Sequence, residues 1–403
     1  MISLFKNRAF VYLWIAQGLS QLANNVLLFF ITFFIYKKTN SNIAVSIVLL
    51  VYLLPSFVSS ILAGVIVDRM GKKWILFFTM LLRAFFVFFM FFSAHTVFYL
   101  YIFICLLSFT TQFFTPAESS IMPKLVPRDK LIEANAYFAS TINLSLIGGF
   151  FLSSFLFKFF GFNTIFFIFG AYIISTCTLY FLPIKEKVFY TNFRQPFFNL
   201  IKKFSFHLLL VIKDFVRDKS ISQCIFSIVF LQVVFFILIA LSPGFADKIL
   251  KIPVEDLSFL IVLPIALGFL IASLVVNRID IAYKQKKLSR VFFILCGSIF
   301  LFIFVISQFH SRSFFNFLNF ILFVGFGFSS GIIMIISYTN LQKATSDERR
   351  AGYFGLLNAL INIASIIPVF LSGILSDVFG VDKIAVWLAI VFFIVSFYVP
   401  KNQ

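Results

Sequence analysis

The chain has 403 residues, of which 61% are hydrophobic and only 12% charged, and its formal net charge is +18. Soluble domains carry about 25% charged residues, so this composition excludes an ordinary soluble enzyme or binding domain. The basic residues lie in short segments between apolar runs rather than on one arm or face, which argues against nucleic-acid binding. We therefore expect a polytopic membrane protein.

Twelve apolar stretches are each predicted to cross ~30 Å of hydrocarbon as a helix. They lie near residues 10–35, 43–67, 74–94, 97–115, 135–157, 163–182, 222–242, 257–277, 289–309, 314–340, 352–375 and 383–399. The longest interval between them separates six stretches from six. The predicted fold is an all-α membrane protein of twelve transmembrane helices in two pseudo-symmetric six-helix bundles, 1–182 and 222–403. The linker 183–221 is predicted to carry an interfacial helix.

The Lys and Arg residues outside the spans divide 25 to 7 between the two sets of alternate connections. Because basic connections stay in the cytoplasm, both termini are predicted to be cytoplasmic, in the inner membrane of a bacterium. The four cysteines fall singly inside apolar spans, without the spacing of metal ligands. We expect neither a metal site nor a cofactor.

Polar residues inside the first span form a single helical stripe. Gln17, Gln21, Asn24 and Asn25 follow the spacing i, i+4, i+7, i+8, which places them on one face. A polar face in lipid is expected to point into the bundle, where it lines a substrate cavity or makes hydrogen bonds between helices. Both interpretations remain open.

A charged, glycine-rich turn at 64–76 joins the second and third spans. Its glycines allow close helix approach and a tight reversal, and its charged residues can cap helix ends or pair with neighbouring helices. We assign a gating role to Gly64, Asp68, Arg69, Gly71, Lys72 and Lys73.

Two ionisable residues stand out beyond this turn. Arg83 lies about ten residues after Lys73, roughly 15 Å along a helix, where a guanidinium needs a partner or water. Glu118 is the only carboxylate predicted to enter the inner half of the bundle, so it is the candidate for ion coupling, with structural pairing to Arg83 as the alternative. Three further cavity candidates are Asn143, Asn358 and Asn362.

An internal repeat relates the two halves at a constant offset. Phe151-Leu152-Ser153 falls on Phe370-Leu371-Ser372, and Phe160-Gly161 falls on Phe379-Gly380. Such a duplication predicts two similar bundles with a binding site between them near the bilayer midplane.

These segments carry a family resemblance. Residues 64–76 resemble the G-x-L-a-D-r-x-G-r-k-x-x-l motif of the major facilitator superfamily, with Ile66 in the Leu position. Residues 114–136 and 350–380 are similar to segments of the branch that contains macrolide-efflux type and enterobactin exporters and, more distantly, the lysophospholipid transporter. The resemblance implies a monomeric alternating-access carrier that exports amphipathic molecules, usually driven by protons.

The predicted function is thus secondary active export of an amphipathic small molecule such as a drug or metabolite. Related transporters frequently have Asp at the position of Asn24, so coupling runs through Glu118 or another ion, or transport is facilitated. The alternatives are a lysophospholipid transporter, for which membrane lipid is the substrate, and a non-transporting scaffold. The chain has no Walker P-loop and no nucleophile elbow, so we do not expect an enzyme.

Overall fold

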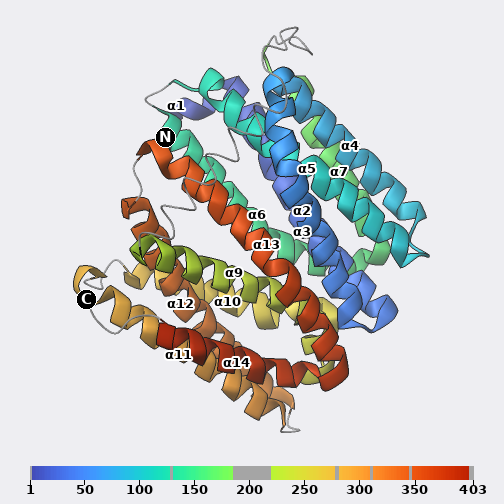
Figure 1. Ribbon diagram of the computed structural model, residues 1–403. Helices are drawn as coiled ribbons and strands as arrows, with labels where there is room; N and C mark the ends of the chain where they lie inside the picture. The colour runs from blue at the N-terminus through green and yellow to red at the C-terminus, as the bar shows by residue number, and fades with distance from the viewer. Residues whose placement is uncertain are drawn as a thin grey trace. The chain divides into compact units, whose positions relative to one another are not determined.

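The computed structural model describes residues 2–127, 130–184, 219–276, 281–308, 312–344 and 347–398, and α-helices make up most of these ranges (Figure 1). A short helix, α1 (Ile2–Phe5), comes first. Twelve helices of 14 residues or more follow in the described ranges. They are α2 (Arg8–Thr39), α3 (Asn42–Arg69), α4 (Lys72–Phe92), α5 (Val97–Leu125), α6 (Leu131–Phe160), α7 (Thr164–Tyr180), α9 (Lys219–Phe245), α10 (Leu263–Val276), α11 (Ile281–Ser307), α12 (Arg312–Ala344), α13 (Asp347–Phe379) and α14 (Val381–Tyr398).

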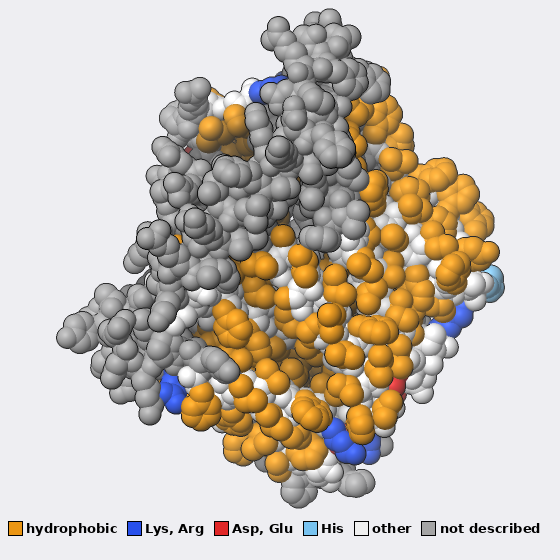
Figure 2. Space-filling model, in the orientation of Figure 1, with side chains coloured by type: hydrophobic (Ala, Val, Ile, Leu, Met, Phe, Trp, Pro, Cys, Tyr) orange, Lys and Arg blue, Asp and Glu red, His pale blue; other side chains and the backbone are white. Residues whose placement is uncertain are grey.

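The apolar sequence accounts for this helical structure, because a backbone in hydrocarbon must satisfy its own hydrogen bonds. Eight helical stretches of the described residues are long and apolar enough to cross a membrane, and Asn42–Pro55 and Leu260–Val276 are shorter apolar stretches. The all-α prediction is confirmed for the described part of the chain. Hydrophobic side chains cover much of the described surface in Figure 2, as expected of a lipid-facing surface.

Helix boundaries differ from the predicted spans where polar residues continue a helix. The span predicted at 289–309 is already helical in the described residues from Ile281 on, because the Ala-Tyr-Lys-Gln-Lys-Lys stretch before it contains several good helix formers. The span predicted at 257–277 instead starts with a 3₁₀ turn (Val254–Asp256) and a π-helical turn (Ser258–Val262) before α10. Hydropathy marks the lipid-crossing part of a helix and not its ends.

The described chain forms two compact units. The first contains Met1–Phe34 and Leu50–Phe204, and the second contains Ile35–Leu49 and Ser205–Gln403. The connection between α2 and α3 is thus grouped with the second unit. The sequence predicted instead that all residues before the linker belong to the first bundle. The predicted interfacial helix of the linker falls within 185–218, outside the described residues.

In the first unit, α4 packs against both α5 and α7 (Figure 1). Helices α2 and α6 approach each other closely at Gly149, where an added Cβ would lie 2.5 Å from the Asn25 Cβ. Trp14 Nε1 donates to Thr141 Oγ1 at 2.9 Å between the same two helices. This first unit holds most of the polar candidates.

In the second unit, α10 packs on α12, and α11 packs on α14 (Figure 1). A Cβ added at Gly268 would overlap the Val324 carbonyl oxygen, and one at Gly327 would overlap the Ile265 carbonyl oxygen. The two backbones are therefore in direct contact, an arrangement that small residues permit between helices in lipid.

The internal repeat is visible in the helix ends. Helices α6 and α13 end at Phe160 and Phe379, so this pair of ends obeys the offset of the repeat. The next residues after α6 and α13, Gly161 and Gly380, have φ of 54° and 101°. Glycine is favoured at such positive-φ positions after a helix, so the duplication preserves helix termination.

Candidate functional site

Arg83 lies inside the first unit and not on its lipid surface. Helix α4 buries Leu76, Met80, Arg83 and Val87 on one stripe, at the spacing of a face that packs against neighbouring helices. The Arg83 side chain is 2% exposed, and its Cζ lies 5.3 Å from the centroid of the Phe114 ring on α5. A cation over an aromatic face is attracted by the ring, but its burial still requires further polar neighbours.

Those neighbours come from three other helices. Glu118 on α5, Tyr172 on α7 and Tyr52 on α3 all interact electrostatically with the guanidinium. Glu118 is 8% exposed and Tyr172 is fully buried. The layer therefore combines one cation, one carboxyl group and two phenols, which we call the Arg83 layer.

Several atoms of this layer keep unused hydrogen-bonding capacity. Within the described part of the chain, Arg83 Nε and Nη2, Glu118 Oε1 and the Tyr172 hydroxyl make no hydrogen bond of regular geometry. Nearly all buried polar side-chain atoms in proteins are paired, and an unpaired one costs about 1–3 kcal/mol. These atoms can therefore accept a polar partner, whether water, an ion or a polar group of a substrate.

Asn24 and Tyr52 extend the layer toward α2. Asn24 Nδ2 donates to the Tyr52 hydroxyl at 3.0 Å, and Ser108 Oγ donates to the Tyr52 carbonyl oxygen. Asn24 therefore makes a hydrogen bond between helices, one of the two roles considered for the polar stripe. The bond fixes Tyr52 beside the Arg83 layer.

The other residues of the polar stripe on α2 differ in how deeply they are buried. Gln17 is fully buried, and neither of its amide atoms has a partner among the described residues. Gln21 and Asn25 are partly buried. Like several atoms of the Arg83 layer, the Gln17 amide atoms are therefore buried without a hydrogen-bond partner in the described structure.

The lysines of the glycine-rich turn cap helix ends. Lys72 Nζ donates to the Val67 and Met70 carbonyl oxygens at 2.7 and 3.3 Å, at the end of α3. Lys73 Nζ donates to the Leu182 carbonyl oxygen at 2.7 Å, just after α7. Cations at helix C-termini are stabilising, so both lysines hold this turn in place. Gly71 is buried with extended backbone, while the surroundings of Gly64 and the side chains of Asp68 and Arg69 are not described.

The structure does not test the remaining cavity candidates. The side chain of Asn143 lies outside the described residues. Asn358 is exposed and Asn362 is partly buried, and both belong to the second unit. Their involvement in substrate binding stays a prediction.

Sequence reasoning missed Tyr52 and Tyr172. An aromatic residue in an apolar span is usually interpreted as part of the lipid-facing or interfacial surface. The chain has 65 Phe but only 13 Tyr, so a hydroxyl within a span is a departure from its prevailing choice of aromatic residue. That contrast was the available signal.

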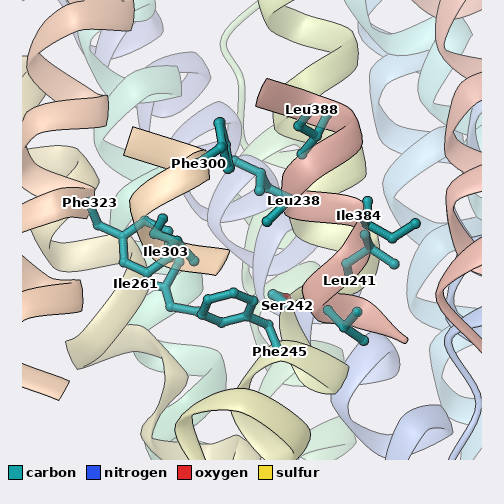
Figure 3. Close-up of a pocket in the computed structure, with 12 residues that line it drawn as sticks. Leu238, Leu241, Ser242, Phe245, Ile261, Phe300, Ile303, Phe323, Ile384 and Leu388 are labelled. Carbon is teal, nitrogen blue, oxygen red and sulfur yellow. The ribbon is translucent and has the colours of Figure 1, made fainter. Parts of the chain in front are cut away.

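The second unit contains a pocket of different character (Figure 3). Aliphatic and Phe side chains of α9, α11, α12 and α14 form most of its lining. Ser242 is the single polar residue of this lining, and its hydroxyl donates to the Ile239 carbonyl oxygen at 2.8 Å. The pocket therefore offers apolar contact without charge.

Comparison with known proteins settles the family. The family model of the Major Facilitator Superfamily matches residues 13–369. The chain belongs to the major facilitator superfamily. This confirms the resemblance of the sequence motifs and the expectation that the protein is a transporter and not an enzyme. A multi-pass membrane protein with two six-helix bundles fits the helices described above.

One sequence relative matches part of the chain, and two solved structures match its fold. Macrolide efflux protein A of Streptococcus pyogenes is 30% identical over 142 residues, a segment that spans 34% of this chain and 35% of that protein. The nucleoside transporter NupG aligns with a TM-score of 0.68 at 14% identity and covers 98% of this chain and 100% of its own. A bacterial homologue of the human lysosomal transporter Spinster aligns with a TM-score of 0.72 at 11% identity, over 96% and 94% of the two chains.

Proposed function

We propose that this major facilitator protein exports an amphipathic organic molecule across the inner membrane of a bacterium, by alternating access and as a monomer. The observation that carries this proposal is the Arg83 layer, a buried cation and carboxyl group with unused hydrogen-bonding capacity. The partial similarity to macrolide efflux protein A supports export of this class of molecule. The distribution of Lys and Arg supports a cytoplasmic location for both termini.

Within this proposal, Arg83 and Glu118 divide recognition and coupling. Glu118 interacts electrostatically with Arg83, so its protonation state changes the polar environment that the guanidinium offers to a substrate. The two groups are therefore placed to link proton transfer to substrate binding or release. The aromatic Phe114 ring supplies the apolar contact that an amphipathic molecule needs.

The test is efflux of a compound panel, macrolides included, from an exporter-deficient strain with and without an uncoupler. We expect uncoupler-sensitive efflux of at least one amphipathic compound by the unmodified chain and its loss in Arg83→Ala. Accumulation that is identical with and without the protein across the panel would contradict export. Movement of a fluorescent lysophospholipid in proteoliposomes, without efflux of any drug, would favour the lipid-transporting alternative.

A further inference from the structure

A carboxylate of α13 binds the beginning of α3, far away in the sequence. Asp377 accepts hydrogen bonds from Ser41 Oγ at 2.6 Å and from the backbone N–H groups of Asn42 and Ile43 at 3.0 and 3.1 Å. It also accepts one from Asn42 Nδ2 at 2.9 Å. All these residues belong to the second unit. Four donors from a distant part of the sequence thus converge on one carboxylate.

These donors lie at the N-terminus of a helix, where an anion is favoured. The first N–H groups of a helix have no partner within the helix, and the helix dipole favours an anion there. Ser41 caps α3 locally, since its hydroxyl accepts from the Ala44 N–H at 3.3 Å. Asp377 adds a second cap with a full negative charge, and charged hydrogen bonds are stronger than neutral ones.

Two glycines form the seat for this part of α3. A Cβ added at Gly373 would overlap Ser46 Oγ, and a Cβ added at Gly244 would overlap the Asn42 side chain. Asn42 and Ser46 are fully buried. The start of α3 therefore sits in direct contact with the backbones of α9 and α13.

The end of α2 is held beside it. The Tyr36 hydroxyl donates to Asp247 Oδ2 at 3.1 Å, and Lys37 Nζ lies 2.6 Å from Glu255 Oε1. Asn40, with φ of 51°, turns the chain between the two helices. Both sides of this connection, residues 35–49, are thus bound by the second unit, although the rest of α2 and α3 belongs to the first.

We propose that Asp377 is a latch that holds residues 35–49 on α13 in one state of the transport cycle and releases them in the other. The proposal rests on the alternating-access function above, because a connection shared between two moving bundles must be released when they separate at that end. The latch occurs in only one of the two copies of the internal repeat. The residue that corresponds to Asp377 in the first copy of the repeat is Lys158, whose positive charge is unsuited to capping a helix N-terminus.

The experiment measures release of residues 35–49 directly. The four cysteines are replaced by serine and Ser46→Cys is introduced as the reporter, since Ser46 is buried against Gly373. Purified protein in proteoliposomes is treated with a small membrane-impermeant thiol reagent, and the labelling rate of the reporter is followed. We expect Asp377→Asn to raise this rate about tenfold, the change that a loss of about 1.4 kcal/mol in latch stability produces.

A matched control is available at the same end of the second unit. Asp382 contacts Gln308 Nε2 at 3.4 Å instead of residues 35–49, so Asp382→Asn should leave the labelling rate unchanged. Ser41→Ala removes one donor and keeps Asp377, so it should raise the labelling rate by a smaller factor. This variant replaces Asp377→Asn in the test if Asp377→Asn does not fold. Equal rates in Asp377→Asn, Ser41→Ala and the unmodified reporter protein would overturn the latch. Because labelling requires no substrate, a failure of the export assay would leave this outcome unaffected.

Discussion

The two units of this transporter share a helix plan but differ in the chemistry of their interiors. The first unit buries Arg83, Glu118 and Tyr172 together, whereas the second unit contains a pocket lined by aliphatic and Phe side chains. In the second copy of the repeat, these three positions correspond to Phe302, Ser337 and Val391, and Tyr52 corresponds to Ile271. The duplication has preserved the glycine that follows α6 and α13, and it has not preserved these ionisable groups.

This difference suggests how the proposed transport work is distributed. Charge in a membrane interior is costly and is retained where it has a function, so the first unit is the natural place for recognition and coupling. The second unit supplies tightly packed helices, as at Gly268 and Gly327, and the seat for residues 35–49. The predictions below test whether function really is concentrated in the first unit.

The largest effect is expected at Arg83. Arg83→Ala should lower efflux by ~100-fold or more, about 2.7 kcal/mol, because it removes the cation and leaves Glu118 buried without compensation. The repeat-related control is Phe302→Ala, on an exposed side chain of α11, which should keep most of its activity. Efflux rates normalised to the amount of folded protein make the comparison. Equal losses in the two variants would show that the first unit has no special role.

Glu118→Gln separates coupling from binding. The amide fixes an uncharged state, so gradient-driven efflux should fall by about tenfold or more while exchange of substrate across the membrane continues, because exchange needs no net proton release. A suitable control is Glu133→Gln, which changes a partly buried carboxylate in the first turn of α6. The measurement is efflux with and without an uncoupler, beside exchange in proteoliposomes. Unchanged uncoupler-sensitive efflux in Glu118→Gln would assign coupling to another group.

Packing, in contrast, should be most sensitive in the second unit. Gly327→Ala places a methyl group on the Ile265 carbonyl and should cost about 1–3 kcal/mol of stability, as overpacking commonly does. The control Gly170→Ala, on α7, meets nothing within 4 Å and should be neutral or slightly stabilising. Thermal unfolding of the two purified variants in detergent measures the difference. Similar melting temperatures would show that the contact between α10 and α12 relaxes easily.

Much of this architecture follows from the sequence, because hydropathy and the internal repeat report on lipid crossing and helix termination. Glu118 was recognisable as the one carboxylate predicted to enter the inner half of the bundle, although it lies beyond the predicted span 97–115. Tyr52 and Tyr172 were not, since a single sequence does not show whether a tyrosine faces lipid or a buried cation. The bonds from Ser41 and Asn42 to Asp377 join opposite ends of the chain, and no local pattern predicts such a pairing.

The smallest and most specific effect is expected from two phenol-to-phenyl changes in the first unit. The Tyr172 hydroxyl lies beside the Arg83 guanidinium but makes no hydrogen bond of regular geometry in the described structure, so Tyr172→Phe removes only a weak polar contact and should change stability little. The Tyr52 hydroxyl accepts from Asn24, so Tyr52→Phe should cost about 0.6 kcal/mol, the average for such bonds in membranes.

The two variants should rank differently in transport rate and in stability. If the Arg83 layer handles substrate, Tyr172→Phe should slow efflux about threefold to tenfold without loss of stability, because it removes a polar atom beside the guanidinium. Melting temperature and efflux rate are measured on the same preparations of Tyr172→Phe, Tyr52→Phe and the unmodified protein. A Tyr172→Phe variant that is less stable and fully active would mean that its hydroxyl serves packing. The unused polar capacity of the layer would then have no part in transport.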